Sequence, residues 1–214
     1  MSSESIDSID ALLARYVAGT LPAPAQLLVA AHLEIKPDNR PFVAGLESLA
    51  GISLERSDAA PFADRDARLA AVFDAPEPAI PAGPKPGAGI FPGVLRDFVG
   101  FGAEDVPWRT KMPGFRECDL GEIDGCNLSL FWIKPGRKIP AHTHEGFELS
   151  LVLDGAFSDI YGRYGRGDIS IADDTVDHRP IAESERPCIG MAVTDGPLRL
   201  TGPLRQRLGD ILFS

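Results

Sequence analysis

Cysteine is scarce in this chain, which has only three among its 214 residues: Cys118, Cys126 and Cys188. The number is odd and no two of them form a Cys-x-x-Cys pair, so the sequence predicts no disulfide framework and favours a reducing compartment. Long apolar runs are lacking too, because no stretch is long enough to cross a bilayer and the first residues are polar and acidic. We therefore expect a cytoplasmic protein without a membrane partner.

Positive charge is also in short supply. Lysine and arginine together number 21 against 31 aspartates and glutamates, which gives a formal net charge of −10 at pH 7. Direct binding to nucleic acid needs a basic face that replaces the counterions of the phosphates, so this class of partner is excluded. A basic protein partner is compatible with the acidic balance.

Residues 1–75 have the hydrophobic spacing of helices. The sequence predicts four of them: one ending near Gly19, one between Pro22 and Pro37, one over residues 42–49 and one over residues 64–73. Gly51 is expected to end the third helix, because glycine is the residue best suited to a helix C-terminus. We expect these helices to hold together through their own apolar faces.

The composition changes sharply after residue 75. Residues 76–92 contain six prolines and three glycines without hydrophobic periodicity, which predicts an extended linker. Farther along, short β-prone runs alternate with glycine and proline turns, as is typical of an antiparallel sandwich or barrel; they are 126–133, 147–153, 169–172 and 189–193. The predicted fold class is therefore two-domain, with a small all-α N-terminal domain (1–75) and an all-β C-terminal domain (93–214).

The strongest chemical signal lies in residues 136–148. His142 and His144 are two residues apart, so in a β-strand both imidazoles project to the same face. Glu148 rejoins that face if the extended chain resumes, whereas Glu145 has an odd offset and points to the other face. Two imidazoles and a carboxylate that converge on one point are ligands for a metal such as Zn, Fe or Mn.

The spacing around these residues resembles the first motif of the cupins. Five residues separate Gly136 from His142, one separates His142 from His144, three separate His144 from Glu148, and six separate Glu148 from Gly155. Each of these positions looks like its counterpart in the motif. The resemblance implies that the all-β domain is a cupin, that is, a small jelly-roll barrel.

A second cupin motif is expected about one hairpin later and supplies another histidine. Counting from Gly167 places His178 at that position, although Asp173 and Thr175 replace the motif's usual proline and second glycine. Cupins typically hold one metal through three histidines and a glutamate. The resemblance therefore implies one divalent metal, zinc in the first place with iron, manganese and nickel as alternatives, bound by His142, His144, Glu148 and His178.

Further stretches extend the resemblance over most of the chain. Residues 12–21 and 30–34 are similar to the helical N-terminal domain of ChrR-type anti-sigma factors, and residues 106–110, 130–133 and 151–157 to the cupin domain of the same family. In that family the helical domain clamps an extracytoplasmic-function sigma factor and blocks its access to RNA polymerase. The resemblance implies a cytoplasmic anti-sigma factor whose metal-binding cupin senses an oxidative or small-molecule signal.

The zinc motif of the family's N-terminal domain is degenerate here. His32 matches its first position, but Lys36 and Asn39 occupy the two cysteine positions, and the N-terminal histidine position falls at or near Asp7. A lysine at neutral pH has no lone pair to donate, and a structural zinc needs about four ligands. We therefore expect a folded, zinc-free helical domain in which His32 binds no metal.

Cys188 is the candidate redox sensor, because it follows His178 on a predicted strand and its thiol could face the barrel cavity. The alternative is a packing role, since cysteine is among the most buried residue types. Two other function classes stay open. One is a metal-dependent cupin enzyme of the dioxygenase or hydrolase kind, for which the sequence names no general acid or base. The other is a non-catalytic small-molecule-binding cupin whose helices mediate homo-oligomerisation.

Overall fold

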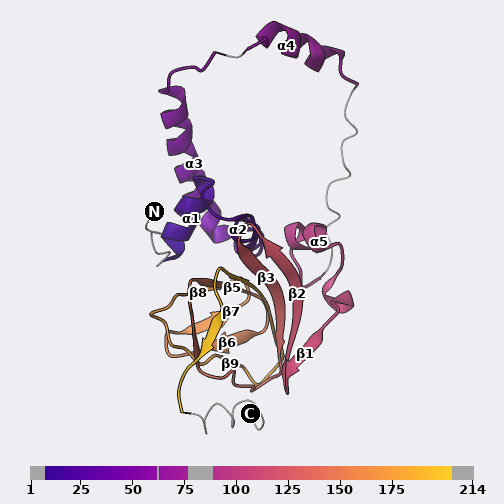
Figure 1. Ribbon diagram of the computed structural model, residues 1–214, viewed down its shortest axis with the longest axis vertical. Helices are drawn as coiled ribbons and strands as arrows, with labels where there is room; N and C mark the ends of the chain where they lie inside the picture. Colours follow the sequence, from indigo (N-terminus) through magenta and orange to yellow (C-terminus); the bar gives the residue numbers. More distant parts are fainter. Residues whose placement is uncertain (1–7, 62, 77–88, 204–214) are drawn as a thin grey trace.

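A computed structural model describes residues 8–61, 63–76 and 89–203 (Figure 1). The helical elements are α1 (Ile9–Val17), α2 (Ala23–Ile35), the 3-10 turn η1 (Pro37–Asn39), α3 (Arg40–Glu55), α4 (Arg65–Asp74), α5 (Gly93–Val99) and a second 3-10 turn, η2 (Ala103–Asp105). None of the helices in these residues is long and apolar enough to cross a membrane. Most of the predicted linker, 76–92, lies outside the described residues.

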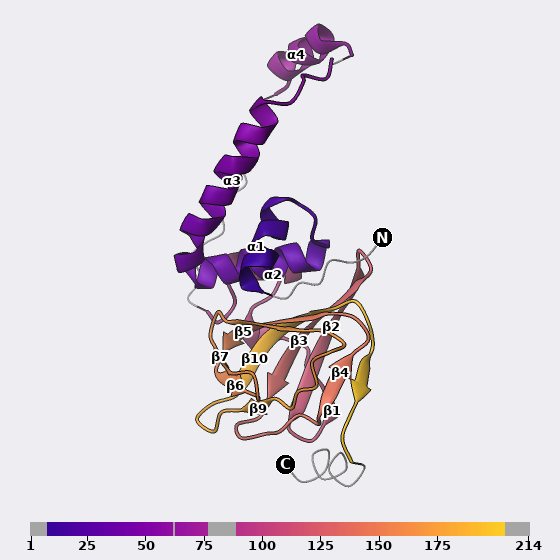
Figure 2. The same ribbon diagram turned by 90° about the vertical axis from the view of Figure 1, so that its left-hand side faces the viewer.

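Eleven strands follow in the described part of the chain. They are β1 (Arg109–Met112), β2 (Phe115–Ile123), β3 (Cys126–Ile133), β4 (His142–His144), β5 (Glu148–Asp154), β6 (Ala156–Ser158), β7 (Arg163–Gly165), β8 (Ile169–Ala172), β9 (Ile181–Ala182), β10 (Cys188–Thr194) and β11 (Leu198–Leu200). The largest sheet has the order β1-β2-β3-β10-β5-β8, and smaller sheets have the orders β11-β4 and β7-β6-β9. All paired neighbours are antiparallel, and together the sheets form the predicted barrel (Figure 2).

Local sequence signals explain where most helices begin and end. The Ser8 side chain accepts a hydrogen bond from the backbone N–H of Ala11 at 3.2 Å and so caps α1. Pro37 ends α2, as predicted, and begins η1. The predicted end of the third helix was wrong, because α3 runs through Gly51 to Glu55. A single internal glycine costs a helix only about 1 kcal/mol, which does not end it.

Helix α2 lies between the other helices and the barrel. It contacts α1 and α5 on one side and strands β3, β5 and β10 on the other. Its buried residues accordingly cover about 200° of the helix circumference, a wider face than the single stripe of a surface helix: Pro24, Ala25, Leu28, Val29, Ala31, His32 and Leu33. The barrel also caps its N-terminus, where Asp124 accepts a hydrogen bond from the N–H of Ala23 at 3.1 Å.

The hydrophobic core does not divide at the predicted domain boundary. Leu12 and Leu28 of the helices belong to the same buried cluster as Leu128 of β3 and Leu149 of β5. The boundaries 1–75, 76–92 and 93–214 therefore stay a prediction. Beyond its first turn α3 leaves this core, and α4 lies at the far end of the molecule from the barrel (Figures 1 and 2).

Candidate metal centre

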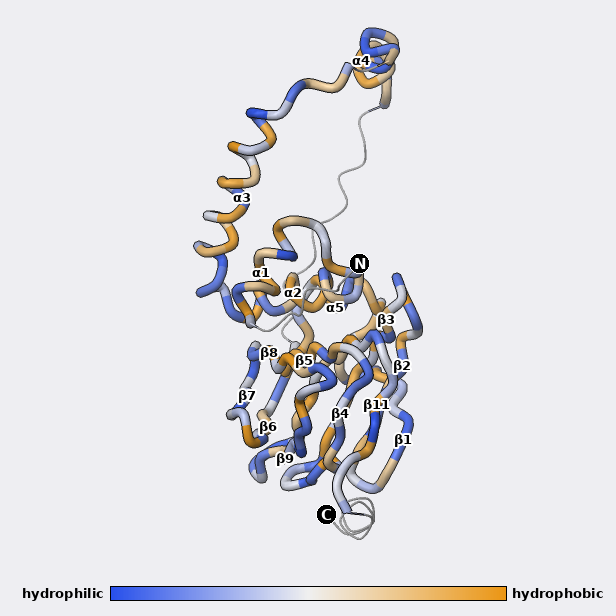
Figure 3. The backbone as a smooth tube through the Cα atoms, turned by 60° about the vertical axis from the view of Figure 1, so that its left-hand side comes forward, coloured by the Kyte–Doolittle hydropathy of each residue, from blue (hydrophilic) through white to orange (hydrophobic). Residues whose placement is uncertain are grey.

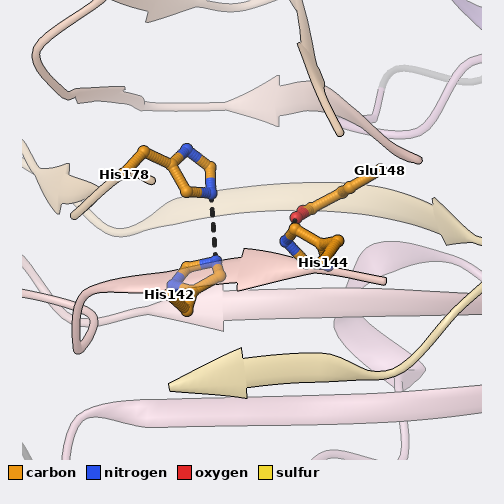
Figure 4. Close-up of side chains that lie close together, drawn as sticks. All are labelled: His142, His144, Glu148 and His178. Atoms are coloured by element: carbon orange, nitrogen blue, oxygen red, sulfur yellow. Dashed lines mark hydrogen bonds and ion pairs between the residues drawn. The ribbon is translucent and has the colours of Figure 1, made fainter. Parts of the chain in front are cut away.

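The barrel brings the four predicted ligands together. His142 and His144 lie on β4, Glu148 begins β5, and His178 lies between β8 and β9. Each residue offers one ligand atom, and these atoms all lie within 4.8 Å of one another (Figure 4). No other group of three or more histidine, cysteine, aspartate or glutamate side chains in the described ranges meets the same criterion.

The strand alternation of β4 aims its two histidines inward. Both imidazoles are buried, while the hydroxyl of Thr143 between them donates to the carbonyl of Asp174 at 3.2 Å. On the backbone, the N–H of His142 donates to the carbonyl of His178 and the reverse bond has the same length, 3.0 Å. This pair of bonds places His178, 36 residues farther along the chain, directly opposite His142.

The hydrogen bonds of His142 and His178 select one tautomer of each neutral imidazole. His142 Nδ1 lies 2.8 Å from the carbonyl oxygen of Pro140, and His178 Nδ1 lies 3.1 Å from a carboxylate oxygen of Asp159. Because carbonyls and carboxylates accept, Nδ1 is the protonated nitrogen of each neutral ring, and Nε2 is then the atom with the lone pair. These Nε2 atoms face each other at 3.0 Å, so two lone pairs converge where a cation would bind both.

The other half of the cluster contains buried polar atoms that lack hydrogen bonds. His144 Nε2 contacts Glu148 Oε2, but neither atom has a hydrogen-bond partner of proper geometry, and neither has His144 Nδ1. Leaving such groups buried and unpaired is costly. A metal ion coordinated by one imidazole nitrogen and the carboxylate oxygen accounts for two of these three atoms, so the residues present fit a metal.

Burial and neighbouring charges prepare the ligands for coordination. Burial, followed by the proximity of His178, lowers the pKa of His142 to about 4. Burial alone would raise the pKa of Glu148, but the imidazoles of His144 and His142 and the hydroxyl of Ser150 hold it at about 2. At neutral pH His142 is therefore neutral and Glu148 ionised, which are the states that bind a metal.

A cavity of about 210 Å³ opens beside the cluster. Aromatic and aliphatic side chains line one part of it, and hydroxyl and amide groups line another: Phe115, Phe131, Phe157 and Ile139, and Ser129, Ser170, Asn127 and Thr194. Glu117 also reaches this cavity, but its carboxylate pairs with Lys111 at 2.8 Å. The cavity has room for a small amphipathic molecule next to a metal.

The remaining predicted site residues lie outside this cluster. Cys188 is fully buried among apolar side chains, and burial raises the pKa of its thiol to about 12. A thiol of this kind is protonated and unreactive at neutral pH, so the geometry does not favour the redox-sensor hypothesis, which stays a prediction. Glu145 contacts Arg199 and points away from the ligands, as its offset indicates.

His32, Lys36 and Asn39 form a hydrogen-bonded group at the end of α2. His32 Nδ1 lies 2.7 Å from the carbonyl oxygen of Gly167, and its Nε2 lies 2.8 Å from the amide nitrogen of Asn39. Lys36 pairs with the carboxylate of Asp168. Both imidazole nitrogens of His32 are thus engaged with protein groups.

Sequence reasoning missed Asp159, which orients the predicted ligand His178. Its side chain is 1% exposed, and its second oxygen accepts from the N–H groups of Tyr161 and Gly162 at 2.8 and 3.2 Å. Asp159 lies on the turn after β6, 19 residues before His178, and belongs to no motif that would single it out. Only the folded barrel brings this carboxylate to the imidazole.

Known proteins place this combination of helices and barrel in one family. The ChrR cupin-like domain matches residues 98–199. The anti-sigma-E factor ChrR of Cereibacter sphaeroides is 41% identical over 197 residues, which cover 89% of this chain and 89% of that protein. The crystal structure of Rhodobacter sphaeroides SigE in complex with the anti-sigma ChrR matches with a TM-score of 0.72 and 39% identity, covering 88% of this chain and 97% of the other. The chain therefore belongs to the ChrR family of anti-sigma factors.

Proposed function

We propose that this protein is an anti-sigma factor that binds an extracytoplasmic-function sigma factor through its N-terminal helices. The observation that carries the proposal is an exposed apolar stripe on α3. It is supported by the similarity of the chain to the anti-sigma ChrR, whose crystal structure is a complex with SigE. A sigma factor has basic surfaces for DNA, which suit the net charge of −10. The site of action is then the cytoplasm, where RNA polymerase works.

The apolar stripe of α3 follows helical spacing. Phe42, Leu49 and Ile52 are 44%, 62% and 46% exposed, and together with Leu46 they lie within about 120° of the helix circumference. Figure 3 shows hydrophobic stretches along α3 where it has left the barrel behind. The apolar faces through which we expected the helices to hold together therefore do not include Leu49, which stays mostly exposed in the described part of the chain. A stripe of this kind is typical of a protein-binding surface.

The cupin supplies the regulatory part of the proposal. One divalent metal, zinc by ligand preference, is bound by His142, His144, Glu148 and His178. A signal acts by changing the relative free energy of the sigma-bound and released states, through the metal, its ligands or an occupant of the cavity. The enzyme alternative is less well supported. An enzyme would need a general acid or base in the cavity, and Glu117, a carboxylate that reaches the cavity without belonging to the four predicted ligands, is already paired with Lys111.

The test uses the full chain and the extracytoplasmic-function sigma factors of its source genome. The wild type should bind one of them, and Leu49→Glu should weaken that binding at least tenfold, because it places a charge in a desolvated apolar contact. Ala44→Glu is the matched control, since Ala44 is exposed on the other side of α3 and gains the same charge. The proposal fails if no sigma factor binds the wild type, and the role of α3 fails if both variants bind equally.

A further inference from the structure

The end of α2 and the start of α3 form a sharp corner that rests on the barrel. His32 is in the last turn of α2, Lys36 follows the helix, and Asn39 immediately precedes Arg40, the first residue of α3. The opposing barrel segment is the turn between β7 and β8, which contains Gly167 and Asp168. Residues more than 130 positions apart in the sequence therefore meet at one place.

The hydrogen bonds at this corner form a continuous chain. Because the carbonyl of Gly167 can only accept, His32 Nδ1 carries the proton, and its Nε2 then accepts from the amide of Asn39. His32 is 3% exposed, and burial lowers its pKa, so the imidazole is neutral as this arrangement requires. The half-exposed pair between Lys36 and Asp168 lies beside it.

The barrel turn fits closely against this corner. A Cβ atom on Gly167 would lie 2.8 Å from Lys36 Cγ and 2.9 Å from a methyl group of Ile35, and the φ angle of Gly167 is +84°. Only glycine combines that backbone conformation with so close an approach. Backbone hydrogen bonds also hold this turn on β5. The N–H of Gly167 donates to the carbonyl of Val152 at 2.8 Å, and the N–H of Val152 donates to the carbonyl of Asp168 at 3.0 Å.

Helix α3 depends on this corner for its direction. Val43 is the single buried residue of α3, so beyond the first turn little packing holds the helix. At the corner, Arg40 Nε donates to the carbonyl of Leu33 at 3.1 Å, and Asn39 is bound to His32. The barrel also holds the other end of α2 through Asp124, so α2 is attached at both ends and α3 extends from a fixed base.

We propose that His32, Lys36 and Asn39 form a metal-free latch that fixes the α2–α3 corner to the β7–β8 turn and thereby sets the direction in which α3 presents its apolar stripe. The two residues that occupy cysteine positions of the family's zinc motif thus bond to protein groups instead. The consequence for partner binding rests on the proposed function, whereas the latch itself does not.

Hydrogen exchange of the full chain tests the latch directly. Asn39→Ala leaves His32 Nε2 without its partner, so amides over residues 33–43 should exchange about fivefold faster or more, the size of one lost hydrogen bond. Lys36→Ala should speed the exchange of the same amides by a smaller factor, since the ion pair between Lys36 and Asp168 is partly exposed and contributes less. Asp38→Ala is the matched control, because Asp38 is exposed on the same turn. Amides of β3 and β10 should be unchanged in all three, which shows that the barrel stays folded.

Equal exchange over residues 33–43 in Asn39→Ala and Asp38→Ala would overturn the latch. Binding to the sigma factor tests the second part, because Asn39→Ala should weaken it about fivefold or more by loosening a preorganised surface. Unchanged affinity alongside faster exchange would overturn the role of the latch in partner binding. Absence of sigma binding by the wild type would refute the proposed function, while the exchange result would still decide the latch.

Discussion

Replacing Asp159 by asparagine tests how the metal centre is organised. The wild-type carboxylate accepts from His178 Nδ1 on one oxygen and from the N–H groups of Tyr161 and Gly162 on the other. Asparagine has one acceptor and one donor group, so it cannot replace both oxygens. If its NH₂ faces His178, two donors oppose each other; if it faces the backbone, it opposes two N–H groups.

The expected magnitude follows from the imidazole tautomer. When the NH₂ faces His178, Nδ1 has no acceptor and its proton moves to Nε2, the atom that faces His142 and the proposed metal position. Loss of such an outer partner typically costs 10- to 100-fold in metal affinity, or about 1.4–2.7 kcal/mol. The side chain of Asp159 is 1% exposed, so water cannot easily replace it. We expect Asp159→Asn to weaken zinc binding by this factor.

Competition with a chromophoric zinc chelator measures the affinity. Asp177→Asn is the matched control, since it makes the same change next to His178 at an exposed carboxylate, which accepts from the hydroxyl of Thr201 at 2.6 Å. Circular dichroism establishes that both variants are folded. Zinc affinity of Asp159→Asn equal to that of the wild type would refute the idea that this carboxylate sets the tautomer of His178.

Three further predictions concern the metal, the thiols and pH. His142→Ala should reduce bound metal from one equivalent per chain toward zero by elemental analysis, and a full equivalent remaining would place the metal elsewhere. Cys188 should resist thiol reagents at pH 8 in the native state and react after denaturation, because burial raises its pKa to about 12; rapid native labelling would contradict this. Burial lowers the pKa of His32 below its ordinary 6.5, with Lys36 opposing and Asp168 favouring its protonation. The unfolded chain therefore binds this proton more readily, so stability to urea should fall as pH drops below about 6.5, and less so in His32→Gln.

Much of the metal site could be predicted from local spacing. The alternation of side chains along a strand places His142 and His144 on one face in any extended conformation, and the structure has them both buried on β4. The strands over 126–133 and 169–172 also agree, since β-prone runs between turns are locally determined. The helical start of the chain was predictable in the same way from proline positions and apolar periodicity.

Other features depend on contacts that periodicity does not encode. An apolar stripe on α3 shows that the helix is amphipathic, but not that Leu49 would remain uncovered. A buried α2 predicts a core, but not that this core is shared with β3 and β5. The short strands β4, β6, β7, β9 and β11 were not predicted individually, because a two- or three-residue strand exists only through its partner.

The sequence by itself determined the chemical identity of the ligands and their local orientation, because side-chain direction along a strand is a property of the backbone. Only the tertiary structure decided which distant groups complete them. The closed barrel brings His178 to His142 and Asp159 to His178, and the docked helices bring His32 to Gly167. These contacts span 19 to 135 positions, and the chain closes them because burial of the shared core offsets the entropy of so many loops.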